Sequence, residues 1–215
     1  MRIHALMNRL IRPFRRRRMR RFAATFGDPA RLSVVDVGGT AFNWRLLAQR
    51  PRLVLVNLER PRGPGEALAG AAFVVGDGTR LGFADGAFDV AFSNSVIEHL
   101  GTPERQRAFA GELRRVAAGL WVQTPARGFP FEPHLLAPGV HWLPRGAQRR
   151  LLRRFTPWGW LARPSPAQVE RFLEQTRLLT GREMRALFPD CEIRRERLCG
   201  LTKAWVAVRR PGGVG

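Results

Sequence analysis

The segment that most constrains the fold is residues 33–42, where a short apolar run ends in an acid and two glycines. The apolar run is typical of a buried strand, and the residues that follow Thr40, through Leu47, are typical of a helix. Gly38 and Gly39 let the backbone turn where a Cβ would clash, and they let a ligand approach main-chain N–H groups near a helix N-terminus. The segment therefore predicts a strand, a tight turn and a helix, with Asp36 facing a ligand at the carboxyl end of the strand.

Further apolar segments recur along the chain, and three of them end in polar residues. The predicted strands cover 53–59, 71–75, 88–92 and 120–125, and the polar residues are Asn57, Glu59, Asp77, Asn94 and Ser95, with Gly78 directly after Asp77. Asn57 and Glu59 follow Asp36 by about the 20 residues at which nucleotide-binding folds place an acid on ribose hydroxyls. We expect one of the two to make that contact.

The first 30 residues form a basic amphipathic segment with apolar residues at helical spacing. Pro13 is expected to end or kink the first helix, and a second short helix is expected from Phe14 to Phe26. We favour a helix packed on the domain edge with a solvated arginine face. The alternative is an arm that contacts an anionic membrane or nucleic acid.

Composition suits one globular domain of 215 residues with 45% apolar residues. The net charge of +20 comes almost wholly from arginine, which is typical of a GC-rich coding bias, and it favours acidic partners. Cys191 and Cys199 lie outside any Cys-x-x-Cys pair, so we expect free thiols. Because no apolar run approaches the roughly 18 residues of a membrane span and the N-terminus lacks a signal peptide, we expect a cytoplasmic protein, with peripheral membrane contact as the alternative.

Helix signals bracket the rest of the chain. Thr102-Pro103-Glu104 predicts a helix whose core face is Phe109, Leu113 and Val116 and which ends at Gly119. Residues 180–183 form a capping box that opens a helix up to Pro189, and two strands are expected after it, at 191–198 and 202–208.

In this order the pieces resemble a class I S-adenosylmethionine-dependent methyltransferase of type 11, in the broad group that includes the ubiquinone- and menaquinone-biosynthesis methyltransferases. The likeness is most specific at residues 74–78, 83, 88–90 and 96–100. It implies an α/β, Rossmann-like, doubly wound sheet of seven strands, mostly parallel, with a C-terminal antiparallel hairpin. The methyltransferase domain would cover residues 31–210.

The resemblance also implies a cofactor, S-adenosylmethionine, and assigns roles along the strand ends. Asp36, Gly38 and Gly39 match the motif that holds its methionine part, with Thr40 and Phe42 in place of the family's usual later glycines. Asn57 or Glu59 matches the ribose position, Asp77 (with Gly78) the adenine position, and Asn94 and Ser95 the strand end beside the methionine. Glu98-His99 resembles part of a metal motif whose first acid is here Ser95, so we expect no metal and consider His99 a base or a turn residue.

Residues 125–165 form a long connection, which is typical of a lid or substrate-binding element. It carries His134, His141, Trp142 and an arginine-rich helix at 149–154, with Trp158 and Trp160 beyond it. Two interpretations stay open: lid packing with a solvated arginine face, or binding of the acceptor, with His134 as a further catalytic candidate. We expect methyl transfer to a small-molecule, lipid-like or glycan-like acceptor; the alternatives are an RNA methyltransferase and a non-catalytic binding protein that keeps the fold.

Overall fold

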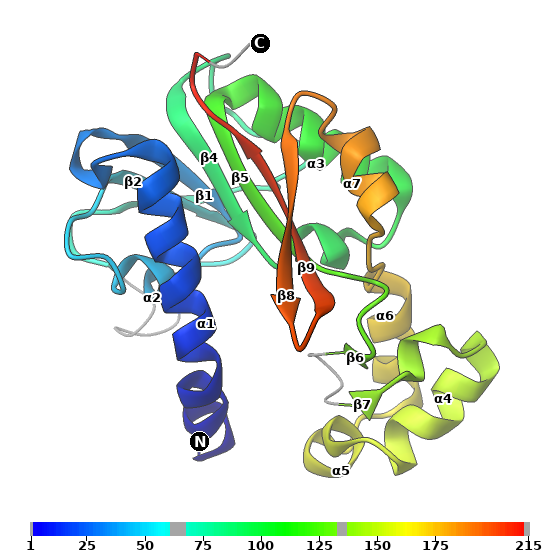
Figure 1. The fold of residues 1–215 in the computed structure, drawn as a ribbon. Coiled ribbons are helices and arrows are strands. Elements are labelled where there is room, and N and C mark those ends of the chain that lie inside the picture. The colour runs from blue at the N-terminus through cyan, green and yellow to red at the C-terminus, as the bar shows by residue number, and fades with distance from the viewer. Residues whose placement is uncertain (1, 61–67, 133–136, 213–215) are drawn as a thin grey trace. The chain divides into compact units, whose positions relative to one another are not determined.

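The computed structural model describes residues 2–60, 68–132 and 137–212 (Figure 1). The chain divides into two compact units. The first unit comprises residues 1–94, 111–122 and 208–215, and the second comprises residues 95–110 and 123–207.

Seven strands form one sheet in the order β3-β2-β1-β4-β5-β9-β8. Their bounds are β1 (Ser33–Val37), β2 (Arg52–Asn57), β3 (Ala72–Val75), β4 (Phe88–Asn94), β5 (Ala117–Pro125), β8 (Glu192–Leu198) and β9 (Leu201–Arg209). β1 pairs in parallel with β2 and β4, and β2 with β3, while β8 and β9 form the antiparallel hairpin. The turn of this hairpin has positive φ at Cys199 and Gly200 (48° and 79°), as a tight two-residue hairpin requires. The predicted mostly parallel, seven-stranded Rossmann-like α/β fold is confirmed.

The core of the first unit is built around Phe22. Its ring lies 5.0 to 5.9 Å, between ring centroids, from Phe26, Trp44, Phe92 and Trp121. Three of these contacts are edge-to-face, the geometry that aromatic quadrupoles favour. The N-terminal helix therefore supplies part of the core through its C-terminal half.

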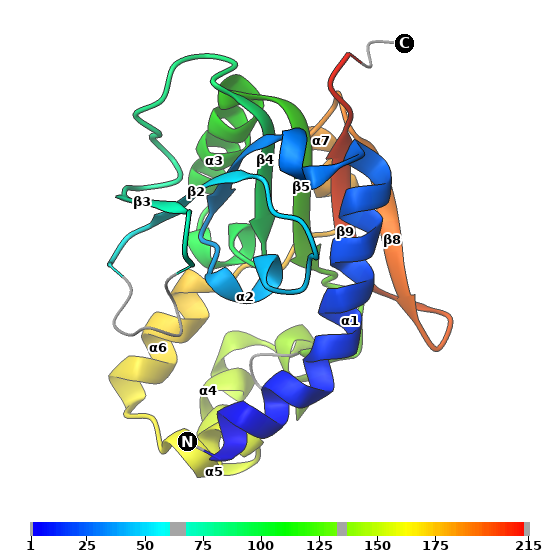
Figure 2. The ribbon, with the colours of Figure 1, turned by 90° about the vertical axis from the view of Figure 1, so that its left-hand side faces the viewer.

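That helix, α1 (Arg2–Phe26), is continuous, and Pro13 lies inside it (Figure 2). The expectation that Pro13 would divide the segment into two helices was therefore wrong. Proline removes one backbone hydrogen bond. Burial of Met19 and Phe22, both at most 1% exposed, holds the part of the helix that follows Pro13.

Two other local expectations need correction. The helix after Thr40 is a single turn, α2 (Ala41–Trp44), and the turn at Arg45 to Leu47 is not helical. Helix α3 (Pro103–Val116) buries Phe109, Leu113 and Val116 as predicted, but it ends at Val116, and Gly119 lies within β5. A Cβ on Gly119 would come within 2.9 Å of the Asp89 carbonyl oxygen, so this glycine serves close packing of the strand rather than helix termination.

The second unit carries a small helical subdomain inserted after β5. It contains β6 (Phe131–Glu132), β7 (Ala137–Pro138), α4 (Arg145–Arg154), α5 (Pro157–Ala162) and α6 (Pro166–Gln175). Buried Val140, Leu152, Val169 and Leu173 give it a core of its own. Capping boxes open α6 at Ser165 and α7 (Gly181–Leu187) at Thr180, the second as predicted. Within the described part of the chain, no helix is both long and apolar enough to cross a membrane.

Candidate functional site

The centre of the candidate site in the first unit is Asp36, which is fully buried at the end of β1. Its Oδ2 accepts a hydrogen bond of 2.7 Å from Trp44 Nε1. Its Oδ1 is also buried, and no described residue donates a hydrogen bond to it. A buried carboxylate oxygen without a donor is costly, which makes this atom a place where a ligand's N–H group would be stabilised.

Burial is the main reason that the pKa of Asp36 rises to about 7, because desolvation disfavours the charged carboxylate. The Trp44 hydrogen bond and the charge of Arg15 both act in the opposite direction. Asp36 thus has a proton affinity in the physiological range, and a cationic group beside it would favour its charged form.

The turn after β1 is shaped around this carboxylate. Gly38 has a φ of 78° and donates its N–H to the Val56 carbonyl oxygen at 2.7 Å. A Cβ on Gly39 would overlap the Asp36 carboxyl group at 1.7 Å, so the carboxylate occupies the space that any other residue would need. Asn57 Nδ2 donates to the Gly39 carbonyl oxygen at 2.7 Å, which ties the turn to the end of β2. The structure therefore brings Asp36, Gly38, Gly39 and Asn57 together.

The remaining predicted cofactor residues lie at the ends of neighbouring strands. Gly76 N–H donates to the Asn57 carbonyl oxygen, which places Asp77 next to the end of β2. Asp77 Oδ1 accepts from the backbone N–H and the hydroxyl of Thr79, both at 2.9 Å, and this orients the carboxylate and fixes the turn that contains Gly78. Thr40 and Glu59 are exposed.

Asn94 ends β4 in the first unit, and Ser95 begins the second unit with a positive φ of 58°. This left-handed conformation is strained for a residue other than glycine. Ser95 is held there by its N–H, which donates to the Gln123 carbonyl oxygen at 2.9 Å, and by its hydroxyl, which lies 3.1 Å from Gln123 Oε1. Strain of this kind is common at functional sites.

Two arginines of α1 belong to the site in the first unit, although the sequence did not indicate them. Arg18 is only 7% exposed and donates a hydrogen bond from Nη1 to Asn94 Oδ1. The Arg15 guanidinium lies 4.9 Å from the ring centroid of Phe42 and is close enough to Asp36 to lower the pKa of that acid. Burial and the charge of Arg18 lower the pKa of Arg15 in turn. The helical spacing of the two arginines fits a shared helix face, but only the docking of α1 shows that they reach the strand ends.

The residues predicted as catalytic candidates are His99 and His134. His99 is exposed in the 3-10 helix Ile97–Leu100, whereas the neighbouring Glu98 is buried and accepts a hydrogen bond of 2.9 Å from Thr124. His134 lies outside the described residues. Among those that are described, no group of three or more His, Cys, Asp and Glu side chains is arranged to hold a metal ion.

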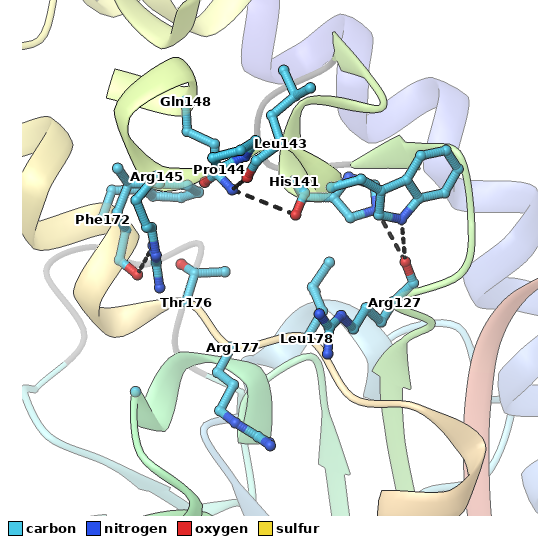
Figure 3. A pocket seen from close by; sticks show the side chains of 13 residues that line it. Arg127, His141, Leu143, Pro144, Arg145, Gln148, Phe172, Thr176, Arg177 and Leu178 are labelled. Atoms are coloured by element: carbon cyan, nitrogen blue, oxygen red, sulfur yellow. Dashed lines mark hydrogen bonds between the residues drawn. The ribbon is translucent and has the colours of Figure 1, made fainter. Parts of the chain in front are cut away.

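A pocket of about 430 Å³ lies wholly within the second unit (Figure 3). Residues 141–145, 172–173 and 176–178 line it together with Gly101, Arg127 and Gln148. The Arg127 carbonyl oxygen accepts from His141 Nε2 at 3.0 Å and from Trp142 Nε1 at 2.8 Å, which orients both rings. Two predicted acceptor residues, His141 and Trp142, therefore line one pocket.

Some polar groups of this pocket have hydrogen-bond partners, and others do not. Arg177 donates to Gln106 Oε1 at 2.6 Å and pairs with Glu183, and Arg145 donates to the Leu173 carbonyl oxygen. His141 Nδ1 and the Thr176 hydroxyl are buried with no hydrogen-bond partner in the described chain. A pocket with cationic, aromatic and unsatisfied polar groups suits a ligand that is partly anionic and partly apolar.

A family model described as a methyltransferase domain matches residues 36–119. This part of the chain is therefore similar to a methyltransferase domain. This range begins at Asp36 and includes the strand ends described above. An uncharacterised methyltransferase of Mycobacterium sp. strain JLS is 40% identical over 88 residues, which are 39% of this chain and 34% of that protein. The chain thus spans about a third of the length of the curated relatives that it matches.

Solved structures extend the likeness to the whole fold. The 1,6-didemethyltoxoflavin-N1-methyltransferase of Burkholderia thailandensis, solved with 1,6-didemethyltoxoflavin and S-adenosylhomocysteine, has a TM-score of 0.56 at 18% identity and covers 92% of this chain and 77% of its own. The magnesium protoporphyrin IX methyltransferase of Synechocystis PCC 6803, solved with S-adenosylhomocysteine, has a TM-score of 0.56 at 15% identity, over 92% and 82%. At these identities the likeness establishes the fold. The resemblance to class I S-adenosylmethionine-dependent methyltransferases is thereby confirmed.

Proposed function

We propose that this protein is an S-adenosylmethionine-dependent methyltransferase that acts on a small anionic acceptor with an apolar part. The observation that carries the proposal is the buried Asp36, which has an Oδ1 atom without a donor and lies under the Gly39 turn at the start of the matched domain. The Mycobacterium relative and the two neighbours bound to S-adenosylhomocysteine support the methyltransferase part of the proposal.

The residues present fit the chemical groups of the cofactor. An α-ammonium group would give Asp36 Oδ1 the donor that it lacks, and would stabilise its charged form. The α-carboxylate suits Arg15 and Arg18, because arginine pairs well with carboxylates. Asn57 or Glu59 would bind the ribose hydroxyls and Asp77 the adenine amino group.

The acceptor is assigned to the pocket of the second unit. Arg127 and Arg145 offer positive charge, Trp142 and Phe172 offer apolar surface, and Thr176 offers an unsatisfied hydroxyl. The bound cofactor supplies a methyl group that is activated for in-line displacement. The protein's contribution is then to orient the acceptor, which can supply much of the acceleration.

A base is needed only for an acceptor that carries a proton. His141 is a candidate besides His99 and His134. Because its Nε2 donates to a carbonyl oxygen, the neutral ring has its lone pair on Nδ1.

Titration calorimetry with S-adenosylmethionine and S-adenosylhomocysteine tests the cofactor half of the proposal. We expect both to bind, and we expect Asp77→Ala to weaken binding by on the order of tenfold, as loss of one charge-assisted hydrogen bond predicts. Asp85→Ala is the matched control, because Asp85 is an exposed acid of the same unit that pairs with Arg115. Unchanged binding in both Asp36→Ala and Asp77→Ala would overturn the assignment of the site.

A screen with radiolabelled cofactor over fractions of a cell extract tests the acceptor half. Transfer of label to small anionic molecules supports the proposal. Label in RNA would favour the RNA methyltransferase alternative. Tight cofactor binding without any transfer would favour a binding protein that keeps the fold.

A further inference from the structure

Basic and large apolar side chains are exposed together on α4 and α5. Phe155, Trp160 and Leu161 are 66%, 62% and 56% exposed. We call these three residues and the neighbouring exposed arginines the α4–α5 face; the arginines are Arg150, Arg153, Arg154 and Arg163. The four arginines and Phe155 line a single hollow of about 780 Å³, so they share one surface; Trp160 and Leu161 do not line it but directly follow Gly159, which does.

This exposure does not result from a missing core. The subdomain buries Leu152 completely, together with Val140, Val169 and Leu173, with Phe172 packed against them. Phe155 and Trp160 are therefore outside a core that is already filled. Large exposed apolar groups gathered on one surface are typical of an interaction site.

The Trp160 side chain and the α5 backbone are also held in position. Trp160 Nε1 donates to the Arg154 carbonyl oxygen at 2.6 Å, which orients the indole. Thr156 caps α5 by accepting from Gly159 N–H at 2.9 Å. A Cβ on Gly159 would come within 2.2 Å of the Leu152 carbonyl oxygen, so α5 packs tightly on the end of α4. Little conformational entropy would remain to be lost when such a surface docks.

The charge of the face is not neutralised within the subdomain. Arg149 forms a two-point ion pair with Glu170, with both N–O distances at 2.6 Å. For Arg150, Arg153, Arg154 and Arg163, the structure gives no acidic partner in the parts of the chain that it describes. The face therefore presents at least four uncompensated positive charges around exposed apolar side chains.

We propose that the α4–α5 face docks on the surface of an anionic lipid bilayer. Acidic headgroups complement the arginines, while Phe155, Trp160 and Leu161 enter the boundary between headgroups and acyl chains, where tryptophan is favoured. Arginine suits this geometry because its stem packs on apolar surface while the guanidinium stays with the phosphates. A single-stranded nucleic acid would use the aromatic rings, but it offers no apolar environment for Leu161.

The proposal does not rest on the proposed function. Docking requires only residues 150–163 of the second unit, whereas cofactor binding is assigned to strand ends of the first. A protein that binds vesicles without binding S-adenosylmethionine would refute only the function, and the converse result would refute only the docking.

Sedimentation with vesicles tests the docking. The full chain should bind vesicles of phosphatidylcholine with 30% phosphatidylglycerol at about 0.1 M salt and should be released as salt screens the charges. Arg153→Glu with Arg154→Glu should weaken the partition at least about tenfold. The control is Arg182→Glu with Arg185→Glu, since these exposed arginines of α7 lie in the same unit and give the same change in charge.

Apolar insertion is tested separately, so that charge alone does not decide the result. Phe155→Ser should weaken binding severalfold, while Leu201→Ser, at a residue 51% exposed in the β8–β9 hairpin, should not. In wild type, acyl chains brominated near the headgroup should quench tryptophan fluorescence. Trp160→Phe should remove most of that quenching while leaving the protein folded, because its side chain is exposed.

Three results would each overturn the proposal. Equal loss of binding in the α7 control would show that only net charge matters. Binding to pure phosphatidylcholine as strong as to the anionic vesicles would remove the role of the arginines. Release from vesicles by an equal phosphate concentration of single-stranded oligonucleotide would identify a nucleic-acid surface instead. If the variant with Arg153→Glu and Arg154→Glu does not fold, the difference in quenching between wild type and Trp160→Phe tests the proposal instead.

Discussion

At the scale of single residues, Asp36 is a carboxyl group whose surroundings balance its charged and neutral forms. Burial favours the protonated form of Asp36, whereas Trp44 and Arg15 favour the charged form, and the net effect raises the pKa to about 7. Because one pKa unit corresponds to about 1.4 kcal/mol, a rise from 3.8 corresponds to about 4 kcal/mol between the folded and unfolded chains. The first unit therefore bears a cost at neutral pH that a cationic ligand group would offset.

The sign of the resulting pH dependence follows from linkage. Between about pH 4 and 7 the folded chain keeps the Asp36 proton and the unfolded chain has lost it, so this group makes stability fall as pH rises. Asp36→Asn should abolish that fall, and the variant should be more stable than wild type at pH 8. Urea unfolding at several pH values between 5 and 8 measures the difference. If the free energy of unfolding of Asp36→Asn falls with pH as steeply as that of wild type, other groups cause the pH dependence.

Cofactor binding should show the opposite pH dependence. A cationic ammonium group binds the charged carboxylate, so the Kd of S-adenosylmethionine should fall as pH rises from 6 to 8. Asp36→Asn should bind weakly and with a flat profile over the same range. Calorimetry at each pH tests this, and identical profiles for the two proteins would remove Asp36 from the ammonium site.

Gly39 gives a second prediction at this scale. In Gly39→Ala the new methyl group would overlap the Asp36 carboxyl, so the turn or the acid must move. We expect the free energy of unfolding to fall by roughly 1–3 kcal/mol. We also expect cofactor binding to become too weak to measure. Gly111→Ala is the control, since its added Cβ meets nothing within 4 Å in α3 and helix propensity favours alanine by about 0.5–1 kcal/mol. Wild-type stability and cofactor binding in Gly39→Ala would contradict the packing seen here.

The residues of the site divide clearly into those that the sequence predicted and those that it did not. Asp36, Gly38, Gly39 and Asn57 were predicted as site residues because a strand end followed by a turn is a local pattern. Arg15 and Arg18 were missed, because their contacts with Phe42 and Asn94 span 27 and 76 residues and depend on where α1 docks. Local periodicity shows which face of a helix is apolar but not which strand end that face meets.

At the scale of elements, α1 is a structural part of the first unit through its second half. Phe22 is fully buried among four aromatic rings, whereas Phe14 is 41% exposed on the same helix. Phe22→Ala should therefore cost about 3–5 kcal/mol in the free energy of unfolding, by loss of buried area and creation of a cavity. Phe14→Ala should cost well under half of that. Thermal unfolding of the two variants compares them directly, and equal effects would refute a core role for α1.

The elements that were wrongly predicted share a physical cause. Pro13 and Gly119 were interpreted as helix terminators, since that is their usual local effect. In the structure, tertiary packing outweighs that local preference: burial of Met19 and Phe22 holds the helix beyond Pro13, and Gly119 is needed where β5 passes close to the Asp89 carbonyl. The positions of β1, β2 and β4 were predicted well, because buried parallel strands have long apolar runs that little else in a sequence imitates.

At the scale of the whole molecule, the two candidate binding regions belong to different units. The matched methyltransferase domain starts at Asp36, and its strand-end residues other than Ser95 lie in the first unit. The pocket lined by Arg127, His141 and Trp142 lies in the second unit. From the sequence, residues 125–165 were predicted to be a lid or acceptor-binding insertion within one domain, because they are too long for a simple connection. The sequence did not predict that the arginines at 149–154 would line a separate hollow, whereas Arg145 at the start of α4 lines the pocket.

The division predicts that variants of residues 125–165 change the use of the acceptor and leave the cofactor unaffected. Trp142→Ala removes a side chain that is 54% exposed and donates to Arg127, so it should raise the KM of the acceptor or lower kcat by on the order of tenfold. His134→Ala should act in the same direction. The Kd of S-adenosylmethionine should stay within about twofold, a difference of roughly 0.4 kcal/mol.

Deleting residues 149–154 is not a clean test of the arginine helix, because it removes Leu152 from the core of the subdomain. Arg150→Gln with Arg153→Gln keeps that core and removes two charges, and it should leave acceptor kinetics unchanged, since these side chains lie outside the pocket. Acceptor kinetics and cofactor calorimetry on the same preparations separate the outcomes. A binding element in the second unit requires that Trp142→Ala weaken binding of the acceptor alone. If this variant weakened binding of the cofactor and of the acceptor equally, residues 125–165 would have a structural role.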